Sequence, residues 1–152
     1  YNLLQQVSGR AGRSKKIGRV FIQTYYPDHP VIKSFKNRDR QNFVKQSLEE
    51  RRQFNIPPFS YMTAIIISSF SKIKAESYAN LLVKSCKFDK SISIMGPVEA
   101  PIFLLRGQYR YRLLLKCDKR KKLNIYTRNL IRNFPPQSSI RLIIDVDPYT
   151  FI

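Results

Sequence analysis

The pattern that most constrains the fold is an alternation of strand-like and helix-like segments from residue 59 onward. β-Branched and aromatic runs predict strands, and apolar residues three or four positions apart predict helices. The strands are expected at 62–70, 91–95, 109–117 and 140–146, and the helices at 71–88 and 119–134. The order βαββαβ is typical of an α+β domain with a split-βαβ, ferredoxin-like sheet and two helices on one face. The other face of that sheet would be available to a partner.

Two further segments precede this domain. Residues 18–26 are rich in β-branched and aromatic side chains, which predicts a buried strand. Residues 30–54 have helical spacing, and Asp39 is placed to cap a second helix there. We therefore expect three parts: a segment with one strand at 1–26, a helical connector at 27–58, and a basic βαββαβ domain at 59–152.

The charge of the chain indicates the class of its partner. A net charge of +18 exceeds what solubility requires, so a polyanion is expected. With 43% hydrophobic and 12% aromatic residues, the chain is not a disordered basic tail. It has no apolar run of the roughly 18 residues that span a bilayer and no signal-peptide pattern. We expect a cytoplasmic protein with no membrane partner.

The metal-ligating residue types are sparse and scattered. Cys86 and Cys117 lie far apart, and His29 is the only histidine. No C-x-x-C pair is present, so no metal site is expected in this chain and both cysteines are expected to be buried, reduced thiols. His29 has no partner for nucleophilic catalysis in its surroundings, so we interpret it as a hydrogen-bonding loop residue.

The most basic segment runs from residue 106 to 132 and contains ten lysines and arginines but only one acidic residue, Asp118. Alternation along a strand puts Tyr109 and Tyr111 on one side and Arg110, Arg112 and Lys116 on the other. If the tyrosine side packs against the helices, the basic side chains can follow a phosphate backbone. If the register is reversed, the tyrosines can stack on unpaired bases. The sequence leaves both arrangements open. The candidate DNA-binding residues are Arg106, Tyr109, Arg110, Tyr111, Arg112 and Lys116.

Both arrangements predict binding to single-stranded or forked DNA without a base code, because phosphate contacts and stacking tolerate any base. The alternative is a solvated basic face with no specific ligand. A separate pair of carboxylates, Asp145 and Asp147, could hold a metal for nuclease chemistry. The interpretation that we favour is that they neutralise nearby arginines, since no third ligand is evident.

An arginine-rich octet occupies residues 6–13, Gln-Val-Ser-Gly-Arg-Ala-Gly-Arg. The planar guanidinium group matches phosphate oxygens, and glycine lets the backbone approach a nucleotide closely. The octet resembles motif VI of superfamily 2 helicases, Q-x-x-G-R-x-G-R, at each fixed position. With Arg106-Gly107-Gln108-Tyr109-Arg110 and the ending Asp145-Val146-Asp147-Pro148, the whole chain resembles the C-terminal part of the PriA (primosomal protein N′) family of bacterial replication-restart helicases.

This resemblance implies an ATP-dependent 3′-to-5′ DNA helicase that acts at stalled forks and in primosome assembly. It implies that Arg10 and Arg13 form an arginine finger, which stabilises charge on the transferred phosphoryl group. The cofactor-binding residues in this chain would be Gln6, Gly9, Arg10, Gly12 and Arg13. Residues 1–26 would be the end of the second RecA-like helicase lobe.

The 152 residues lack a G-x-x-x-x-G-K-[ST] phosphate loop and an acidic magnesium motif. ATP and Mg²⁺ would thus be held mainly by upstream lobes, and the chain alone is not expected to hydrolyse ATP. The resemblance places the family's zinc module upstream as well. It implies single-stranded-DNA-binding protein and primosome proteins as partners, besides single-stranded and forked DNA. The alternative function is a stand-alone, non-catalytic module that binds single-stranded or forked nucleic acid.

Overall fold

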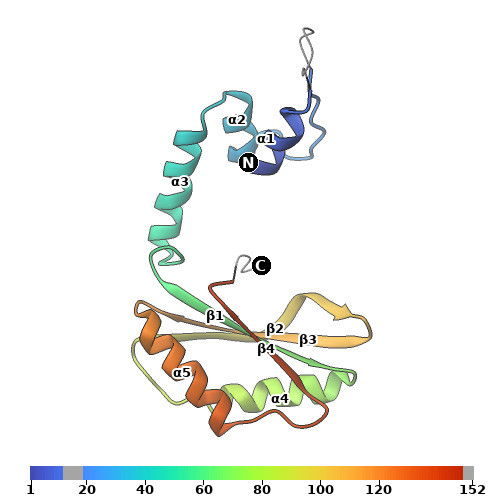
Figure 1. Cartoon of the computed structure of the whole chain (residues 1–152), viewed down its shortest axis with the longest axis vertical. Coiled ribbons are helices and arrows are strands. Elements are labelled where there is room, and N and C mark those ends of the chain that lie inside the picture. The colour runs from blue at the N-terminus through green and yellow to red at the C-terminus, as the bar shows by residue number, and fades with distance from the viewer. Residues whose placement is uncertain (12–18, 149–152) are drawn as a thin grey trace. The chain divides into compact units, whose positions relative to one another are not determined.

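The computed structural model describes residues 1–11 and 19–148 (Figure 1). The chain divides into two compact units, Tyr1–Phe54 and Asn55–Ile152. Across the described residues, no helix combines the length and the apolar character that a membrane crossing requires.

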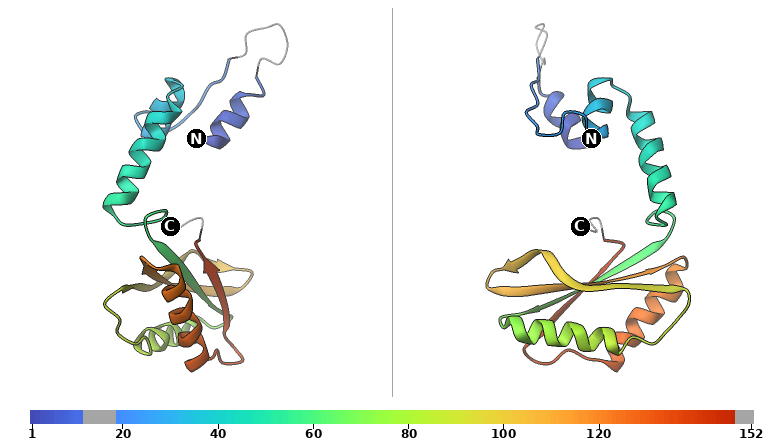
Figure 2. Two further views of the ribbon diagram at one scale, coloured as in Figure 1. Left: turned by 60° about the vertical axis from the view of Figure 1, so that its left-hand side comes forward. Right: turned by 180° about the vertical axis from the view of Figure 1, so that it is seen from behind.

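The second unit is an antiparallel sheet with two helices on one side. Its elements are β1 (Tyr61–Ser69), α4 (Lys72–Lys84), β2 (Ile92–Leu105), β3 (Gln108–Cys117), α5 (Arg120–Asn133) and β4 (Arg141–Val146). The strand order is β2-β3-β1-β4, and every neighbouring pair is antiparallel. Both helices lie on the same side of the sheet in all the views (Figures 1 and 2). The predicted βαββαβ order and split-βαβ sheet are confirmed.

The register of the two central strands decides which side chains form the core. Ile65 of β1 pairs with Leu113 of β3, and Ile67 pairs with Tyr111. Directly opposed residues share a face, so these four side chains point together towards the helices. Burial of this row against the apolar stripes of α4 and α5 is the main stabilisation of the unit. The helices contribute Ala75, Tyr78, Ala79, Leu82, Leu123 and Leu130 to the core.

Strand β2 is longer than the sequence indicates. The prediction ended it at Met95, before a segment rich in glycine and proline, yet β2 continues to Leu105. It does so through two irregularities in its pairing with β3, one between Met95 and Val98 and one between Glu99 and Leu104. Because β2 is an edge strand, prolines without an N–H are tolerated there. At the first irregularity Gly96 has φ +103°, and a Cβ on it would lie 2.8 Å from the Arg112 carbonyl oxygen.

A two-residue turn joins β2 to β3. Leu105 pairs with Gln108, which leaves only Arg106 and Gly107 between the strands. Their φ angles are 51° and 77°. Positive φ at both central positions matches a type I′ turn, whose twist suits a β-hairpin. The turn therefore places Arg106 at the tip of the hairpin.

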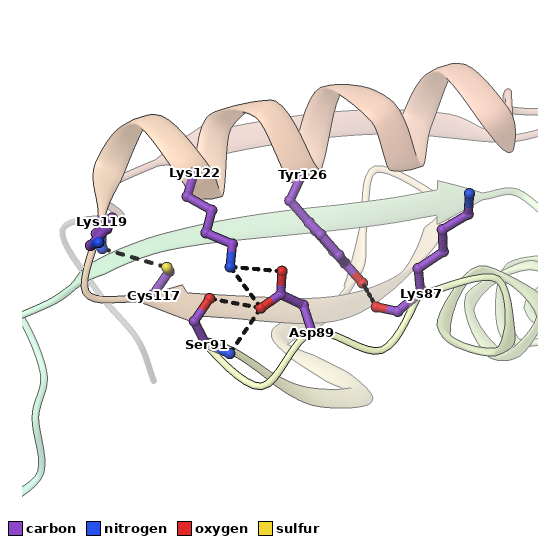
Figure 3. A network of polar contacts seen from close by, with 7 residues as sticks. All are labelled: Lys87, Asp89, Ser91, Cys117, Lys119, Lys122 and Tyr126. Atoms are coloured by element: carbon purple, nitrogen blue, oxygen red, sulfur yellow. Dashed lines mark hydrogen bonds and ion pairs between the residues drawn. The ribbon is translucent and has the colours of Figure 1, made fainter.

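A polar network fixes α5 to the segment that leads into β2 (Figure 3). The Lys122 ammonium lies 2.8 Å from one Asp89 carboxylate oxygen, and the Ser91 amide and hydroxyl donate to the other at 2.9 and 2.7 Å. The hydrogen bond from Lys122, followed by the bonds from Ser91, lowers the pKa of Asp89 to about 2. One turn along α5, the Tyr126 hydroxyl donates to the Lys87 carbonyl at 2.7 Å. Burial, with smaller contributions from Cys86 and Asp89, raises the pKa of Tyr126 to about 12.

The first unit consists of helices in its described part: α1 (Asn2–Ser8), α2 (Pro30–Lys36) and α3 (Arg40–Gln53). The two predicted helices of residues 30–54 are confirmed. The Asp39 side chain caps α3 by accepting from the Asn42 amide, as predicted. The His29 ring caps α2 by accepting from the Val31 amide at 3.2 Å.

The strand predicted at 18–26 is wrong for the described residues 19–26, which have no regular structure. Phe21, Tyr25 and Tyr26 are largely exposed instead of buried. A strand needs neighbours that satisfy its N–H and C=O groups, and the described part of this unit supplies none. The apolar composition of the segment is therefore not sufficient to make it a strand.

Two adjacent leucines test the register of β3. Leu113 is fully buried on the helix side, and Leu114 is half-buried on the opposite face. We expect Leu113→Ala to lower the free energy of unfolding by about 2–5 kcal/mol and Leu114→Ala to lower it much less. Urea unfolding of the two variants measures this difference. A larger cost for Leu114→Ala would contradict the register.

The Asp89 network predicts a pH-dependent stability. A carboxyl whose pKa falls from 3.8 to about 2 on folding stabilises the protein above its unfolded pKa. That contribution is lost as the pH falls through the folded pKa. The melting temperature of the unaltered chain should exceed that of Asp89→Asn above about pH 5, and the two should converge towards pH 2. A gap that does not depend on pH would exclude the carboxylate as its cause.

Candidate nucleic-acid interface

The side of the sheet away from the helices carries the basic residues of β3. Tyr111, Leu113 and Leu115 all point to the helix side and are buried. By alternation, Arg110, Arg112 and Lys116 lie on the opposite side, which we call the open face. Of the two arrangements that the sequence left open, the structure has the one in which the tyrosine row packs and the basic row faces away from the helices.

The two tyrosines predicted to bind DNA lie on the helix side of the sheet, Tyr111 within the core and Tyr109 half-buried against it. Tyr111 is 6% exposed, and its ring meets Phe103 edge-on at 5.6 Å between centroids. Burial, with smaller contributions from Glu76 and Glu99, raises the pKa of Tyr111. Tyr109 is half-buried, with its ring 5.5 Å from that of Phe103. The buried Tyr111 ring has no face free to stack on a base, which corrects the prediction for that residue.

Arg112 lies on the open face but does not extend from it. It is 8% exposed and pairs with Val98 on one side and with Ile66 on the other. With Met95 and Leu114 it lines a shallow cavity of about 410 Å³ along β2. The positive charge of Arg112 therefore lies within the surface of the sheet and does not extend beyond it. Lys116 is half-buried at the other end of β3, where it pairs with Met62 of β1.

One end of the open face gathers three arginines. Ser68 of β1 pairs with Arg110 of β3 on one side and with Arg141 of β4 on the other. These three residues therefore form one row across the sheet, and the two arginines are about 10 Å apart at a spacing of about 5 Å per strand. Arg106 lies beyond this row at the hairpin tip. We call Arg106, Arg110 and Arg141 the arginine end.

The arginine end has no acidic neighbour among the described residues. Its arginines make no ion pair there, and Arg110 donates weakly to the Ile102 carbonyl at 3.5 Å. Asp145 lies on the open face four residue pairs away, opposite Ala64. Glu99 points to the helix side, where it is 3.9 Å from Lys72. Positive charge at this end is therefore uncompensated, which suits a phosphate backbone.

Arg141 was not among the residues predicted from the sequence. It is separated from Arg110 by thirty-one positions and by a helix, and it stands outside the basic segment that ends at Arg132. Only the pairing of β1 with β4 brings it into the row. The alternation in residues 140–146 could have placed it on a face, but not opposite Ser68.

One of the two carboxylates at the end of β4, that of Asp147, neutralises an arginine, as favoured from the sequence. Asp147 follows the strand, turns away with φ 52°, and forms an ion pair with Arg120. Its amide donates to the Met62 carbonyl at 2.8 Å, so it also closes the end of the sheet. Within the described residues, no three His, Cys, Asp or Glu side chains gather where they could hold a metal.

The two cysteines are free thiols. Cys117 is buried in the core, and Cys86 is half-buried. Burial raises the pKa of the Cys86 thiol, and its hydrogen bond with Tyr126 partly offsets this. A raised thiol pKa leaves little thiolate at neutral pH, so the thiol is a poor nucleophile.

The octet at residues 6–13 lies in the first unit and is only partly described. Gln6 is exposed on α1, Gly9 caps the C-terminus of that helix, and Arg10 is exposed in the turn that follows. Gly12 and Arg13 fall outside the described residues. The structure therefore places three of the five predicted nucleotide-binding residues at one helix end.

Comparison with known proteins gives a consistent family. The model of the primosomal protein N C-terminal domain matches residues 52–149. The replication restart protein PriA of Rickettsia typhi is 37% identical over 99% of this chain, and that of Bacillus subtilis is 32% identical over 98%. The PriA of Haemophilus influenzae is 36% identical over 94%.

These relatives are much longer than the chain, which spans 23%, 19% and 20% of their respective lengths. A solved viral protein, the C-terminal DNA-binding domain of the MHV-68 latency-associated nuclear antigen, overlaps 65% of the chain at 18% identity, but its TM-score of 0.38 is too low to indicate a shared fold. On the match of the domain model and of the PriA sequences, the chain belongs to the primosomal protein N C-terminal domain family and corresponds to the C-terminal part of PriA.

Proposed function

We propose that this chain is the DNA-binding and ATP-coupling end of a helicase that restarts replication at stalled forks. The observation that carries the proposal is the cluster of three arginines at the arginine end of the open face. The domain that bears this cluster belongs to the family of the primosomal protein N C-terminal domain. Two parts of the chain take separate tasks. The βαββαβ domain holds DNA, and the octet at residues 6–13 completes an ATP site.

The DNA side of the proposal rests on charge and register. Arg110 and Arg141 project from one row, and Arg106 stands at the hairpin tip. Backbone phosphates are recognised by such side chains without reading a base sequence. This suits a protein that must bind forks of any base sequence. The substrates proposed are single-stranded and forked DNA.

The ATP side of the proposal rests on the octet. Arg10 and Arg13 would stabilise the charge that develops on the γ-phosphoryl oxygens, and Gln6 would link nucleotide state to lobe closure. Lobes outside this chain would hold most of ATP and Mg²⁺, because the phosphate loop is absent from these 152 residues. Exposed aromatic residues at 21, 25 and 26 fit a segment that packs against such a lobe. Single-stranded-DNA-binding protein and the other primosome proteins complete the proposed set of partners.

The DNA-binding role predicts a local charge effect. Arg110→Ala/Arg141→Ala should weaken binding of the chain to labelled single-stranded DNA and lower the log–log salt slope by up to about 1.4, at about 0.7 per phosphate contact. Fluorescence anisotropy over a salt series measures both quantities.

The matched control is Arg128→Ala/Arg132→Ala, which removes the same charge from the exposed surface of α5 on the other side of the sheet. It should keep the slope and most of the affinity. Equal losses in the two double variants would mean that net charge alone drives binding, and the arginine end would lose its assignment.

The ATP-coupling role predicts a separation of activities in the longer protein. There, Arg13→Ala should lower ATP turnover by about 10³- to 10⁵-fold, because the finger acts on the transition state. DNA binding should stay within about twofold, since the octet and the arginine end lie in different units. Steady-state ATPase and anisotropy assays measure the two activities, with Arg19→Ala as the control. Unchanged turnover would mean that Arg13 is not the arginine finger and that this chain contributes only binding.

A further inference from the structure

A large aromatic side chain stands exposed beside the arginine end. Phe70 follows β1 directly and is 73% exposed. A Cβ built on Gly107 would lie 3.8 Å from its ring, so the ring rests against the hairpin turn. It therefore has one edge fixed by the turn, while most of its surface faces solvent.

Two observations place Phe70 near the three arginines already described. Ser68, two residues before it, pairs with Arg110 and Arg141 on either side. Arg106 precedes the glycine that the ring contacts. An exposed phenylalanine lacks the favourable transfer free energy that burial of its ring would provide. A ligand that covers this ring would regain it.

The ligand must satisfy the ring and the arginines together. A nucleotide offers a flat π-system to stack on the ring and an anionic phosphate on each side of the base. A second copy of this chain would bring three more arginines against these three, which is repulsive. The surroundings of Phe70 thus favour a nucleic-acid strand over self-association.

We propose that Phe70 is a base-stacking platform, on which an unpaired base of single-stranded DNA rests while Arg106, Arg110 and Arg141 contact the flanking phosphates. This assignment rests on the proposed DNA-binding function and adds a base contact to it. It requires an unpaired base, because a base inside a duplex has both faces covered. The platform therefore distinguishes single-stranded from double-stranded DNA, which arginine–phosphate contacts alone do not.

The chain contains no tryptophan, so a single substitution gives a local reporter. In Phe70→Trp, the indole should be quenched when an oligothymidine strand binds. An abasic strand of equal length, which keeps every phosphate and lacks the bases, should bind more weakly and leave the fluorescence unchanged. The control is Phe88→Trp, at a phenylalanine 88% exposed in the segment between α4 and β2, and neither strand should quench it.

Affinity supplies the second measurement. Phe70→Ala should bind the oligothymidine at least about fivefold more weakly than the unaltered chain. Its affinity for the abasic strand should equal that of the unaltered chain, because its arginines are intact. Phe88→Ala should match the unaltered chain on both strands. Neither ring is in the core, so circular dichroism and melting should be unchanged in both variants.

The outcomes separate this inference from the function on which it rests. Salt-sensitive binding that is equal for the two strands and unaffected by Phe70→Ala would overturn the platform and leave the arginine end as a phosphate site. Quenching of Phe70→Trp by both strands alike would overturn it too, since the signal would not come from a base. No binding of either strand at low salt would overturn the DNA-binding function itself.

Discussion

The pairing of β3 with β1 is the constraint on which the rest of the second unit depends. Nine consecutive residue pairs join these strands without an irregularity, from Tyr61 with Cys117 to Ser69 with Tyr109. A shift by one residue would turn the tyrosine and leucine row to the open face and the arginines into the core. Burying an arginine without a partner costs several kcal/mol, so the hydrophobic row and the basic row fix the register together.

The same pairing explains why irregularities collect in β2. Both faces of the central pair are committed, one to the helices and one to the basic row, so neither strand can absorb an extra residue. Strand β2 has a partner on one side only and can bulge outward. The two breaks at Met95–Val98 and Glu99–Leu104 let it stay beside β3 up to the turn at Arg106. The position of the arginine end therefore depends on the regular pairing of β1 with β3 and on the irregularities that the edge strand β2 accommodates.

Local patterns predicted the elements of this domain, and pairing between distant segments decided its site. The spacing of apolar residues was sufficient for α4, α5, β1, β3 and β4, because burial sets that spacing wherever the neighbours come from. It could not choose the face of β3, since Leu114 makes the basic row partly apolar as well. It could not identify Arg141 as a site residue, because Arg141 joins the row of arginines only through its pairing with Ser68 of β1. The strand predicted at 18–26 shows the same limit. A strand forms only when a second segment pairs with it, and the composition of one segment does not show whether such a partner is present.

The prolines of β2 have a further consequence for how the protein behaves at high concentration. A long, partly apolar hairpin at the edge of a sheet is a template onto which another chain can add a strand. Pro97 and Pro101 carry no N–H, and the two irregularities interrupt the straight ladder that an added strand would need. The opposite edge is the short strand β4, with charged side chains at Arg141 and Asp145. Both edges of the sheet thus disfavour the addition of a strand from another chain, even though the domain exposes apolar side chains.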